Sequence, residues 1–291
     1  MEFQKIFTKR YYRLSKKGNQ LLKTEINEKD LSRAKLAFLI GITESYLDHL
    51  VRNDRNFRED QLQKILPFLS PNFSSNYLFP QNTIHGKFIT LPKRSSSELM
   101  QIVGYFLGDG NLQKRSLRFK DTSKEVLKVY RGLIKKVFNV KGRIVPQKET
   151  IAYLLEINSF YLKNWLKENV VSRKKEFLEE IRQLSKKEMT AFLRGIFDAE
   201  GSVNLTSRQV NLRLTDEKIV RACQDLLLRL GITTSFCKIN TRNQNWKDCY
   251  CSYFSNRASS GKFRNMVGFS SREKSKKLEL LVSRINKKKI N

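Results

Sequence analysis

The sequence predicts a mixed α/β fold of the α+β type, arranged as a pseudo-two-fold pair of half-domains behind a small all-α domain. Three observations predict it. Two apolar segments, residues 102–110 and 193–201, end in the same way, with a carboxylate followed by glycine. Each segment precedes alternating, strand-like sequence and then an amphipathic helical pattern. A stretch rich in proline, serine and asparagine separates both segments from the helical sequence before them.

The charge of the chain is strongly positive. Its 291 residues include 57 Lys and Arg against 28 Asp and Glu, which gives a formal net charge of +29. Such an excess points to a polyanionic partner, and nucleic acid is the first candidate. No apolar run approaches the length of a transmembrane helix, and the first residues lack the apolar core of a signal peptide. We therefore expect a soluble, intracellular (cytoplasmic) protein with no membrane partner and with its four cysteines as free thiols.

The sequence predicts that residues 1–70 form a small helical domain. Two short amphipathic helices are expected around a turn at Gly41-Ile42-Thr43, with Thr43 as the cap of the second. Their inward positions are Leu36, Ala37, Leu39, Ile40, Leu47, Leu50 and Val51. This pattern resembles the helix-turn-helix of the Cro/repressor type, whose second helix enters the major groove. The resemblance implies that Ser45, Tyr46 and His49, with Glu44, are exposed DNA-binding residues. The alternative is a plain three-helix packing module that binds protein or nothing.

Residues 71–94 predict an irregular connection. Pro71, Pro80 and Pro92 are interleaved there with serine and asparagine. A structureless stretch of this length is unusual inside one compact domain, so we place the domain boundary here. The expected organisation is a helical domain at 1–70, a linker at 71–94, and half-domains at 95–184 and 185–291.

Each of the two matched segments predicts a short helix whose one face is lined by small residues. Capping-box patterns precede them, glycine follows the last apolar turn, and small residues four positions apart share a helical face. The capping pairs are Ser95 with Glu98 and Ser185 with Glu188, the terminating glycines are Gly110 and Gly201, and the small residues are Gly104 with Gly108 and Gly195 with Ala199. Two such faces allow the two backbones to approach closely.

The last helical residues are Asp109 and Glu200, so packing of the helices places these acids side by side. Two neighbouring carboxylates form an oxygen-rich site of the kind that holds magnesium together with phosphate. The helix dipole disfavours an acid at a helix C-terminus, so its occurrence twice favours a use other than stability. The alternative is that these are two buried helices with ordinary polar ends.

Both segments resemble the LAGLIDADG signature of homing endonucleases. The matching positions are Gly104, Asp109 and Gly110 in the first copy and Gly195, Asp198, Ala199, Glu200 and Gly201 in the second. The first copy departs at Leu107 and Gly108, where the signature has Asp and Ala, but it keeps the acid. The resemblance covers about residues 95–285. It implies the order α-β-β-α-β-β-α in each half, and a monomer whose curved sheets form a basic saddle for double-stranded DNA.

A hairpin with one apolar and one polar face follows each helix. The apolar positions are Leu112, Leu117 and Phe119 in the first and Val203, Leu205, Val210, Leu212 and Leu214 in the second, around turns near 114–116 and 207–208. Amide, hydroxyl and guanidinium groups on the other face can read base edges. The expected DNA-binding residues are Gln113, Arg118, Lys120, Asn204, Thr206, Arg208, Gln209, Asn211 and Arg213, with Asn111 and Ser202 on the same faces. A solvated sheet face would usually mix in acids, and these hairpin faces contain none.

An amphipathic helix is expected after each hairpin, at 123–138 and 215–230, stopped by Asn139 and Gly231. The inward positions are Val126, Val129, Leu133 and Val137, then Ile219, Cys223, Leu226 and Leu230. These helices are offset by 92 residues, close to the 91 between Asp109 and Glu200, which indicates an internal duplication. Further strands are expected near 142–157 and 233–254, with closing helices around 160–167 and 271–285.

The resemblance implies a site-specific double-strand DNA endonuclease in which each acid serves one scissile strand. Asp109 and Glu200 would hold Mg²⁺ (or Mn²⁺), which neutralises phosphate charge and helps to generate hydroxide from water. Family members place a lysine near each acid, and Lys120 and Lys274 are the choices here. Two alternatives stay open: a non-cleaving transcriptional regulator of the same fold, as the WhiA regulators suggest, and an intron RNA maturase. An intein is not expected, because the chain starts at Met1 and residues 289–291 lack a His-Asn pair.

Overall fold

The structure, a computed structural model, describes residues 1, 11–28, 32–52, 54–68, 78–81, 89–114, 116–147, 150–240 and 248–287. Residue 115, in the first expected hairpin turn, and residues 289–291 lie outside these ranges. The chain divides into two compact units. One comprises Ile6–Thr90 with Ser159–Tyr161, and the other comprises Met1–Lys5, Leu91–Asn158 and Leu162–Asn291.

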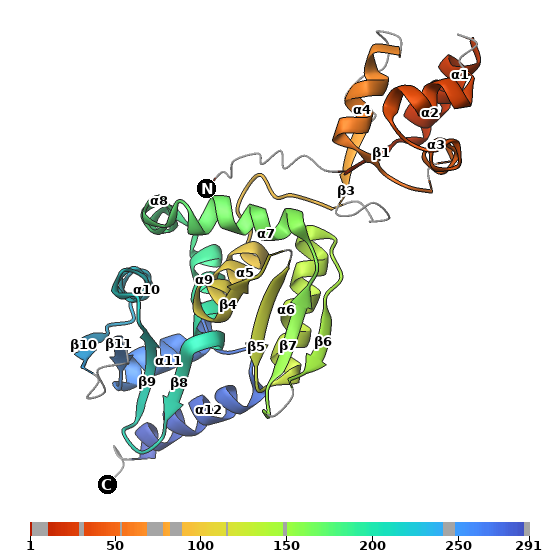
Figure 1. Ribbon diagram of the computed structural model, residues 1–291. Helices are drawn as coiled ribbons and strands as arrows, with labels where there is room; N and C mark the ends of the chain where they lie inside the picture. Colours follow the sequence, from red (N-terminus) through yellow and green to blue (C-terminus); the bar gives the residue numbers. More distant parts are fainter. Residues whose placement is uncertain are drawn as a thin grey trace. The chain divides into compact units, whose positions relative to one another are not determined.

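The smaller unit is mainly helical, with one three-stranded antiparallel sheet of order β2-β1-β3 (Figure 1). Its elements are β1 (Tyr11–Leu14), α1 (Lys16–Glu28), α2 (Arg33–Ile40), α3 (Glu44–Val51), β2 (Phe57–Arg58), α4 (Glu59–Ile65), a 3₁₀ turn (Leu66–Phe68) and β3 (Leu78–Gln81). Periodicity did not predict β1 or α1, because α1 buries only two large apolar side chains, Leu22 and Ile26. Strand β3 falls inside residues 71–94, the stretch expected to be an irregular connection.

Helices α2 and α3 and the turn between them lie where the sequence predicted them. The Ser32 hydroxyl caps α2, Gly41 ends it in the left-handed region at φ 72°, and the Thr43 hydroxyl accepts a 3.2 Å hydrogen bond from the Tyr46 N–H. Leu36 and Leu47 are buried in one core with Leu22 and Leu62. Leu39 was expected in that core, but 39% of its surface is exposed.

From Ser97 to Met266 the chain contains the same seven elements twice, in the order α-β-β-α-β-β-α that the resemblance implied (Figure 1). The first half is α5 (Ser97–Asp109), β4 (Gly110–Leu112), β5 (Leu117–Asp121), α6 (Lys124–Phe138), β6 (Arg143–Pro146), β7 (Tyr153–Ile157) and α7 (Phe160–Leu166). The second half is α9 (Lys186–Glu200), β8 (Gly201–Asn204), β9 (Gln209–Leu214), α10 (Glu217–Arg229), β10 (Ser235–Ile239), β11 (Cys249–Phe254) and α11 (Arg257–Met266). A π-helical turn (Lys167–Val171) and α8 (Lys174–Glu180) connect the halves, and α12 (Arg272–Lys287) follows the second.

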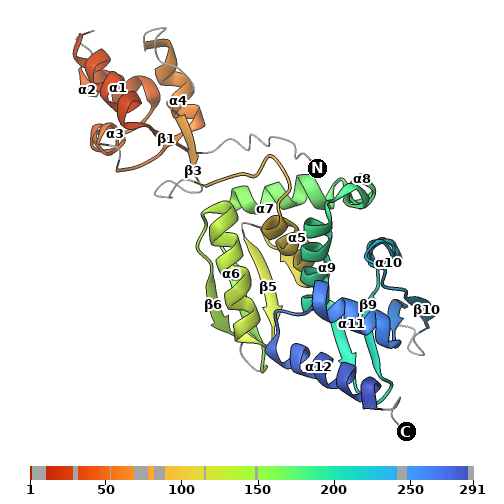
Figure 2. The same cartoon turned by 180° about the vertical axis from the view of Figure 1, so that it is seen from behind.

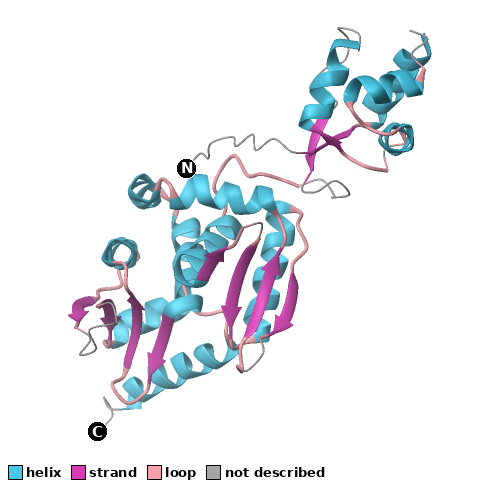
Figure 3. Ribbon diagram, in the orientation of Figure 1, coloured by secondary structure: helices cyan, strands magenta, loops and turns pink. Residues whose placement is uncertain are grey.

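Each half has a four-stranded antiparallel sheet, of order β4-β5-β7-β6 in the first and β8-β9-β11-β10 in the second. Figure 3 shows the two sheets as separate groups of strands with the α5–α9 pair between them. Figure 2 shows α6 lying across one face of the first sheet, where Leu117 and Phe119 are completely buried. Helix α6 ends at Asn139 in the left-handed region, and Gly231, which follows α10, is also left-handed. Both stops were predicted.

The buried face of α6 matches the predicted one only in part, because Val126 is buried as predicted but the largest buried side chains were not predicted. Tyr130, Ile134 and Phe138 are fully buried, whereas Val129 is 41% exposed. The larger side chains occupy the core because they bury more apolar area per residue. In α10 the prediction is confirmed, since Ile219, Cys223, Leu226 and Leu230 are all buried.

The helix that closes the second half is α11, which the sequence pattern did not predict. Residues 271–285, expected to close that half, belong to the additional helix α12. Helix α11 has one large buried apolar side chain, Phe263, and otherwise buries Ser259 and Ser260, so it lacks apolar periodicity. Within the described ranges, none of the helices combines the length and the apolar character needed to cross a membrane.

Candidate metal site and nucleic-acid interface

Helices α5 and α9 pack with their backbones in direct contact, as the small residues predicted. A Cβ atom on Gly104 would lie 2.2 Å from the carbonyl oxygen of Phe192, and a Cβ atom on Gly195 would lie 2.1 Å from that of Gln101. Gly104 and Gly195 are 91 positions apart in sequence, and so are Gln101 and Phe192, which carry the two carbonyl groups. Gly108 faces Ala199 in the same way, with 2.6 Å between its ideal Cβ position and the Ala199 Cβ. A methyl group added at Gly104, Gly108 or Gly195 would therefore collide with the partner helix.

The helix ends are set by local capping. Ser185 and Glu188 form the predicted capping box of α9. The predicted box of α5 is wrong, because its N-cap is Ser96 and not Ser95. Glu98 instead accepts a 2.5 Å hydrogen bond from Lys136 on α6. At the other end, Gly110 and Gly201 cap the helices as predicted, where a Cβ atom would collide with the backbone and ring of Phe106 or Phe197.

Asp109 and Glu200 are the last residues of these helices, and their charges interact. The Glu200 Cγ lies 3.0 Å from the position of a Cβ on Gly108, the neighbour of Asp109. Partial burial and then the charge of Asp109 raise the pKa of Glu200 to about 7, against an opposing effect of Lys274. Two carboxylates that resist joint ionisation are what a divalent cation stabilises most when it binds between them.

The Asp109 carboxylate is surrounded by two lysines and a further acid. Desolvation and the charge of Asp121 raise the pKa of Asp109, while Lys274 and Lys120 lower it. Lys120 is exposed at the end of β5. Both lysines chosen from the sequence therefore lie close enough to act on this acid, although they are 154 positions apart in the chain.

Lys274 is held at the end of α9 by backbone groups. Its Nζ donates hydrogen bonds to the carbonyl oxygens of Asp198 (2.6 Å) and Phe197 (3.3 Å). The Phe197 carbonyl also accepts a hydrogen bond from the Gly201 N–H, and the Asp198 carbonyl belongs to the last turn, whose carbonyls have no partner further along the helix. The lysine therefore caps α9 from α12. Burial lowers the pKa of Lys274, although Asp121, Asp198, Glu200 and Asp109 all oppose that effect.

Two further acids of this cluster were not predicted as site residues. Asp198 is buried and accepts hydrogen bonds from the Tyr130 hydroxyl (2.7 Å) and the Ser270 N–H (2.6 Å). Asp121 accepts one from the Tyr105 hydroxyl (2.8 Å). Both tyrosines come from other elements, so sequence spacing could not reveal these pairs. The sequence provided one indication of this cluster, because Asp198 is among the residues that match the LAGLIDADG signature.

The acidic cluster suits a metal bound by a pair of carboxylates. No group of three or more His, Cys, Asp or Glu residues in the described part of the chain is placed to hold a metal ion together. Asp198 and Asp121 already accept hydrogen bonds from tyrosines, which leaves Asp109 and Glu200 as the candidate ligands. Their donor set, carboxylate oxygens beside a water-accessible helix end, fits Mg²⁺ or Mn²⁺, which keep several waters or phosphate oxygens as ligands.

The polar face of the second sheet and the turn between β8 and β9 carry half of the predicted DNA-binding residues. Asn204, Thr206, Arg208 and Arg213 are exposed, and Gln209 is partly exposed. The Asn204 Oδ1 is used to hold the turn, where it accepts hydrogen bonds from the N–H groups of Thr206 and Ser207. Asn211 lies on the expected face but is only 4% exposed. Its strand, β9, lies between β8 and β11, and its Oδ1 accepts a 2.7 Å hydrogen bond from the Ser202 hydroxyl on β8. Asn211 was expected to be exposed, and it is buried.

The polar face of the first sheet includes an acid on β7, outside the hairpin from which the polar face was predicted. Glu156 on β7 lies directly opposite Arg118 on β5, and Arg143 on β6 lies opposite Glu156 on its other side. Gln113 is partly exposed and donates a 2.7 Å hydrogen bond to Asn111. Strands β5 and β7 are 38 residues apart at this pair, so the hairpin sequence gave no indication of the acid.

In the smaller unit, the candidate residues on α3 differ in exposure. Ser45 is exposed, whereas Tyr46 is partly buried beneath the Arg55 guanidinium, 5.0 Å from its ring centroid. The His49 Nδ1 lies 3.5 Å from Asp54. Tyr46 and His49 therefore have partners within the unit, and Ser45 has the most open position of the three.

Comparisons with known proteins agree with this architecture. The sequence model of the LAGLIDADG-like domain matches residues 96–170 and 187–268. The chain is 32% identical to glutamine–fructose-6-phosphate aminotransferase of Methanocaldococcus jannaschii over 98% of its own length and 26% of that protein. It is 27% identical to the replication factor C small subunit of the same organism over 63% of its own length and 10% of that protein. The chain thus spans about a quarter or less of these relatives.

Two groups of solved structures are similar in fold. I-DmoI in complex with DNA and Mn aligns with a TM-score of 0.44 and 20% identity over 59% of this chain and 96% of that one. Full-length DUF199/WhiA from Thermatoga maritima aligns with a TM-score of 0.47 and 18% identity over 68% of this chain and 63% of that one.

Proposed function

The chain belongs to the LAGLIDADG-like domain family, and from this premise we propose that it is a site-specific double-strand DNA endonuclease that requires a divalent metal ion. Its substrate is duplex DNA bound along the polar faces of the two sheets. Its active centre is the pair of acids at the ends of α5 and α9. The chain acts as a monomer, because both halves of the site come from the same polypeptide.

The observation that supports this proposal best is the position of Asp109 and Glu200 as the last residues of two helices whose backbones are in direct contact. A protein that used these helices only for packing would gain stability by replacing either acid, because helix dipole and mutual repulsion both oppose them. The charges of Lys274 and Lys120 act on Asp109, and that of Lys274 also acts on Glu200, so part of the negative charge would be balanced and part would remain for a cation.

Asp109 and Glu200 would hold Mg²⁺ or Mn²⁺, and a bound divalent ion neutralises charge on the scissile phosphate and makes its water more acidic. The Lys274 Nζ keeps its place at the end of α9 through the Asp198 and Phe197 carbonyls. From there its charge favours the ionised form of Glu200. Lys120 is exposed beside Asp109 and is free to approach a phosphate oxygen.

We assign the smaller unit an auxiliary DNA-binding role through α3. Capped helices on both sides of a left-handed Gly41 support a helix-turn-helix, and exposed Ser45 near the start of α3 supports groove contact. The proposed arrangement is a reader unit followed by two half-domains.

The decisive experiment replaces each acid with its amide, as Asp109→Asn and Glu200→Gln. Both changes keep size and hydrogen-bonding capacity but remove the charge that balances a cation, so double-strand cutting should fall by at least a hundredfold, roughly 3 kcal/mol in barrier. A supercoiled-plasmid assay with Mg²⁺ or Mn²⁺ separates nicked from linear product, and a mobility shift measures binding. Glu179→Gln, at an exposed position of α8, is the matched control and should cut normally.

The outcomes separate this proposal from its rivals. DNA affinity of the amide variants should hold or rise, since one negative charge near the phosphates has gone. Full cutting by either variant would remove that acid from the active centre. A wild-type chain that binds duplex DNA tightly yet never cuts it would identify a regulator of the same fold, and a preference for structured RNA would identify a maturase.

A further inference from the structure

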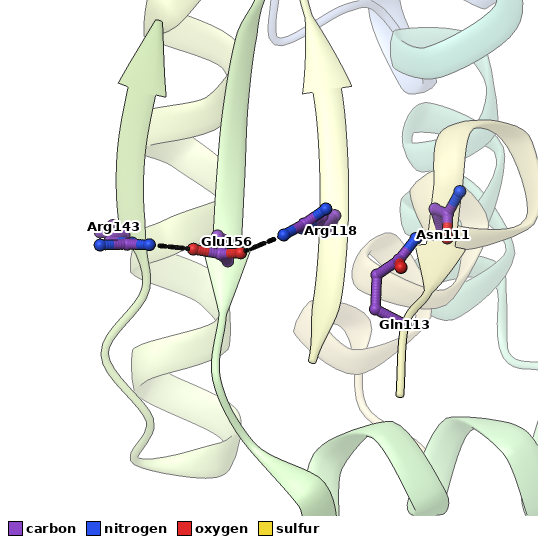
Figure 4. A network of polar contacts seen from close by, with 5 residues as sticks. All are labelled: Asn111, Gln113, Arg118, Arg143 and Glu156. Atoms are coloured by element: carbon purple, nitrogen blue, oxygen red, sulfur yellow. Dashed lines mark hydrogen bonds and ion pairs between the residues drawn. The ribbon is translucent and has the colours of Figure 1, made fainter. Parts of the chain in front are cut away.

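One row of polar side chains crosses all four strands of the first sheet. Asn111, Arg118, Glu156 and Arg143 lie opposite one another on β4, β5, β7 and β6. Residues paired in this way point to the same side of a sheet. Figure 4 shows the row, with Glu156 between the two arginines. The opposite face is the one that packs against α6, so the row lies on the open face.

Each arginine is bound to Glu156 through one edge of its guanidinium. The Arg118 Nε (3.0 Å) and Nη2 (2.6 Å) both donate to Oε1 of Glu156. The Arg143 Nε (2.8 Å) and Nη2 (2.5 Å) both donate to Oε2. The hydrogen bonds from Arg118 and then Arg143 hold the pKa of Glu156 below its usual range, so the acid stays ionised.

This geometry leaves the outer edge of both guanidiniums available. A guanidinium has five N–H donors, and the two on Nη1 together with the second on Nη2 point away from a partner bound at the Nε side. The arginine side chains are 41% and 68% exposed, whereas that of Glu156 is 10% exposed. The acid is therefore enclosed by its two partners, and the arginines present their remaining donors to solvent.

Stability alone gives a weak reason for this network. Exposed ion pairs contribute about 0–1 kcal/mol each, and the fold does not require them. The corresponding row of the second sheet is Ser202, Asn211, Tyr253 and Ser235, which is neutral. The same backbone arrangement thus forms without an arginine pair, and the charged row is a property of the first half.

We infer that Glu156 is a positioning residue that fixes Arg118 and Arg143 as a pair of guanine readers in the first half-domain. The inference rests on the proposed binding of duplex DNA. The Nη1–Nη2 edge of arginine matches the O6 and N7 acceptors of guanine in the major groove. Holding the Nε edge in place reduces the rotamer freedom that is lost when the base is bound, so the contact becomes more selective.

The test uses the full chain and duplexes selected by it from a randomised 24-base-pair library. The wild-type chain should enrich a duplex that has guanine at fixed positions in one half of its length. Substitution of those guanines by 7-deazaguanine, which lacks the N7 acceptor, should weaken binding by about tenfold. Glu156→Gln keeps the shape of the side chain but removes its charge. It should reduce discrimination at those positions by about tenfold while binding to random DNA holds or increases.

Three further variants make the result specific. Arg118→Lys and Arg143→Lys keep the charge but remove the planar fork, so each should lose discrimination at its own guanine with little change in general affinity. Glu217→Gln breaks an arginine–glutamate pair on α10, with Arg221, and should leave discrimination unchanged. Because the lysine variants keep the positive charge of the row, they test the inference even where Glu156→Gln unfolds the sheet.

An equal change of affinity for all sequences in Glu156→Gln and in the lysine variants would overturn the inference, since the arginines would then contact phosphate. So would a wild-type chain that is indifferent to 7-deazaguanine. These results leave cleavage by Asp109 and Glu200 untouched. Conversely, selective binding without cutting would overturn the endonuclease and keep the readers, and a chain that enriches no sequence would overturn both.

Discussion

Lys274 donates a 2.6 Å hydrogen bond to the Asp198 carbonyl and thereby joins the first turn of α12 to the last turn of α9. The acids that define the site come from the duplicated helices, but this lysine comes from a helix outside the duplication. The balance of charge around Asp109 and Glu200 therefore depends on residues beyond the second half-domain.

Replacing Lys274 with Met should move the pH profile of cutting to higher pH. Lys274 lowers the pKa of both Glu200 and Asp109, so its loss raises both and delays their ionisation. The measurement is the rate of plasmid cutting at saturating Mg²⁺ from pH 6 to 9. Lys276→Met, at an exposed position of α12, is the control. An unshifted profile in Lys274→Met would show that the lysine acts only as a helix cap.

Glu200→Gln should stabilise the metal-free protein at alkaline pH. The pKa of Glu200 is raised to about 7 in the folded state, from an ordinary value of 4.5. Between these values the folded state keeps a proton that the unfolded state has released, so wild-type stability falls as pH rises and is lowest above pH 7. After allowance for partial solvation, the gain in the variant should be about 1–2 kcal/mol at pH 8.5 and close to zero at pH 4. Urea unfolding with a chelator present measures both.

Gly104→Ala and Gly195→Ala should each destabilise the larger unit by at least about 3 kcal/mol, because the added methyl group meets a carbonyl oxygen of the partner helix and neither backbone can yield cheaply. Gly132→Ala is the matched control. That residue also lies within a helix, α6, but a Cβ atom there meets nothing within 4 Å, so the variant should gain about 0.5–1 kcal/mol. Thermal unfolding of the three variants compares them. Similar losses at all three positions would contradict the close contact.

Opposite charges at position 45 test the role of α3. Ser45→Lys should strengthen and Ser45→Glu should weaken binding to a long duplex, each by several-fold, if α3 lies against phosphates and bases. Cutting of a short duplex that spans only the two half-domains should be equal in both variants. Equal affinities for the long duplex would instead assign α3 to protein packing.

The sequence was most informative where structure depends on neighbours in the chain. Caps, terminating glycines and the small residues of α5 and α9 placed the helix pair correctly, because helix geometry fixes which residues four apart share a face. The two lysines were chosen on weaker grounds, and their catalytic role stays a prediction, although the charges of both act on Asp109. In contrast, Ser96 rather than Ser95 caps α5, since adjacent serines offer the same hydroxyl, and Glu98 accepts its hydrogen bond from Lys136 of α6.

The features that were missed depend on long-range register. Glu156 meets Arg118 across 38 residues, and Tyr130 meets Asp198 across 68. Helix and strand periodicity relate residues only a few positions apart, so the sequence pattern indicates neither pair. Tyr130 of α6 was missed for a related reason, because a tyrosine is taken as polar until its hydroxyl is given a buried partner.

The charged row of the first sheet and the neutral row of the second make the two halves of the duplicated fold chemically different. A duplex that matches both rows must be different at its two ends, so rotating the chain by half a turn on that duplex would set arginines against the wrong bases. Under the proposed function, the chain therefore seats in a single polarity, and Asp109 and Glu200 are each committed to one particular strand of the target.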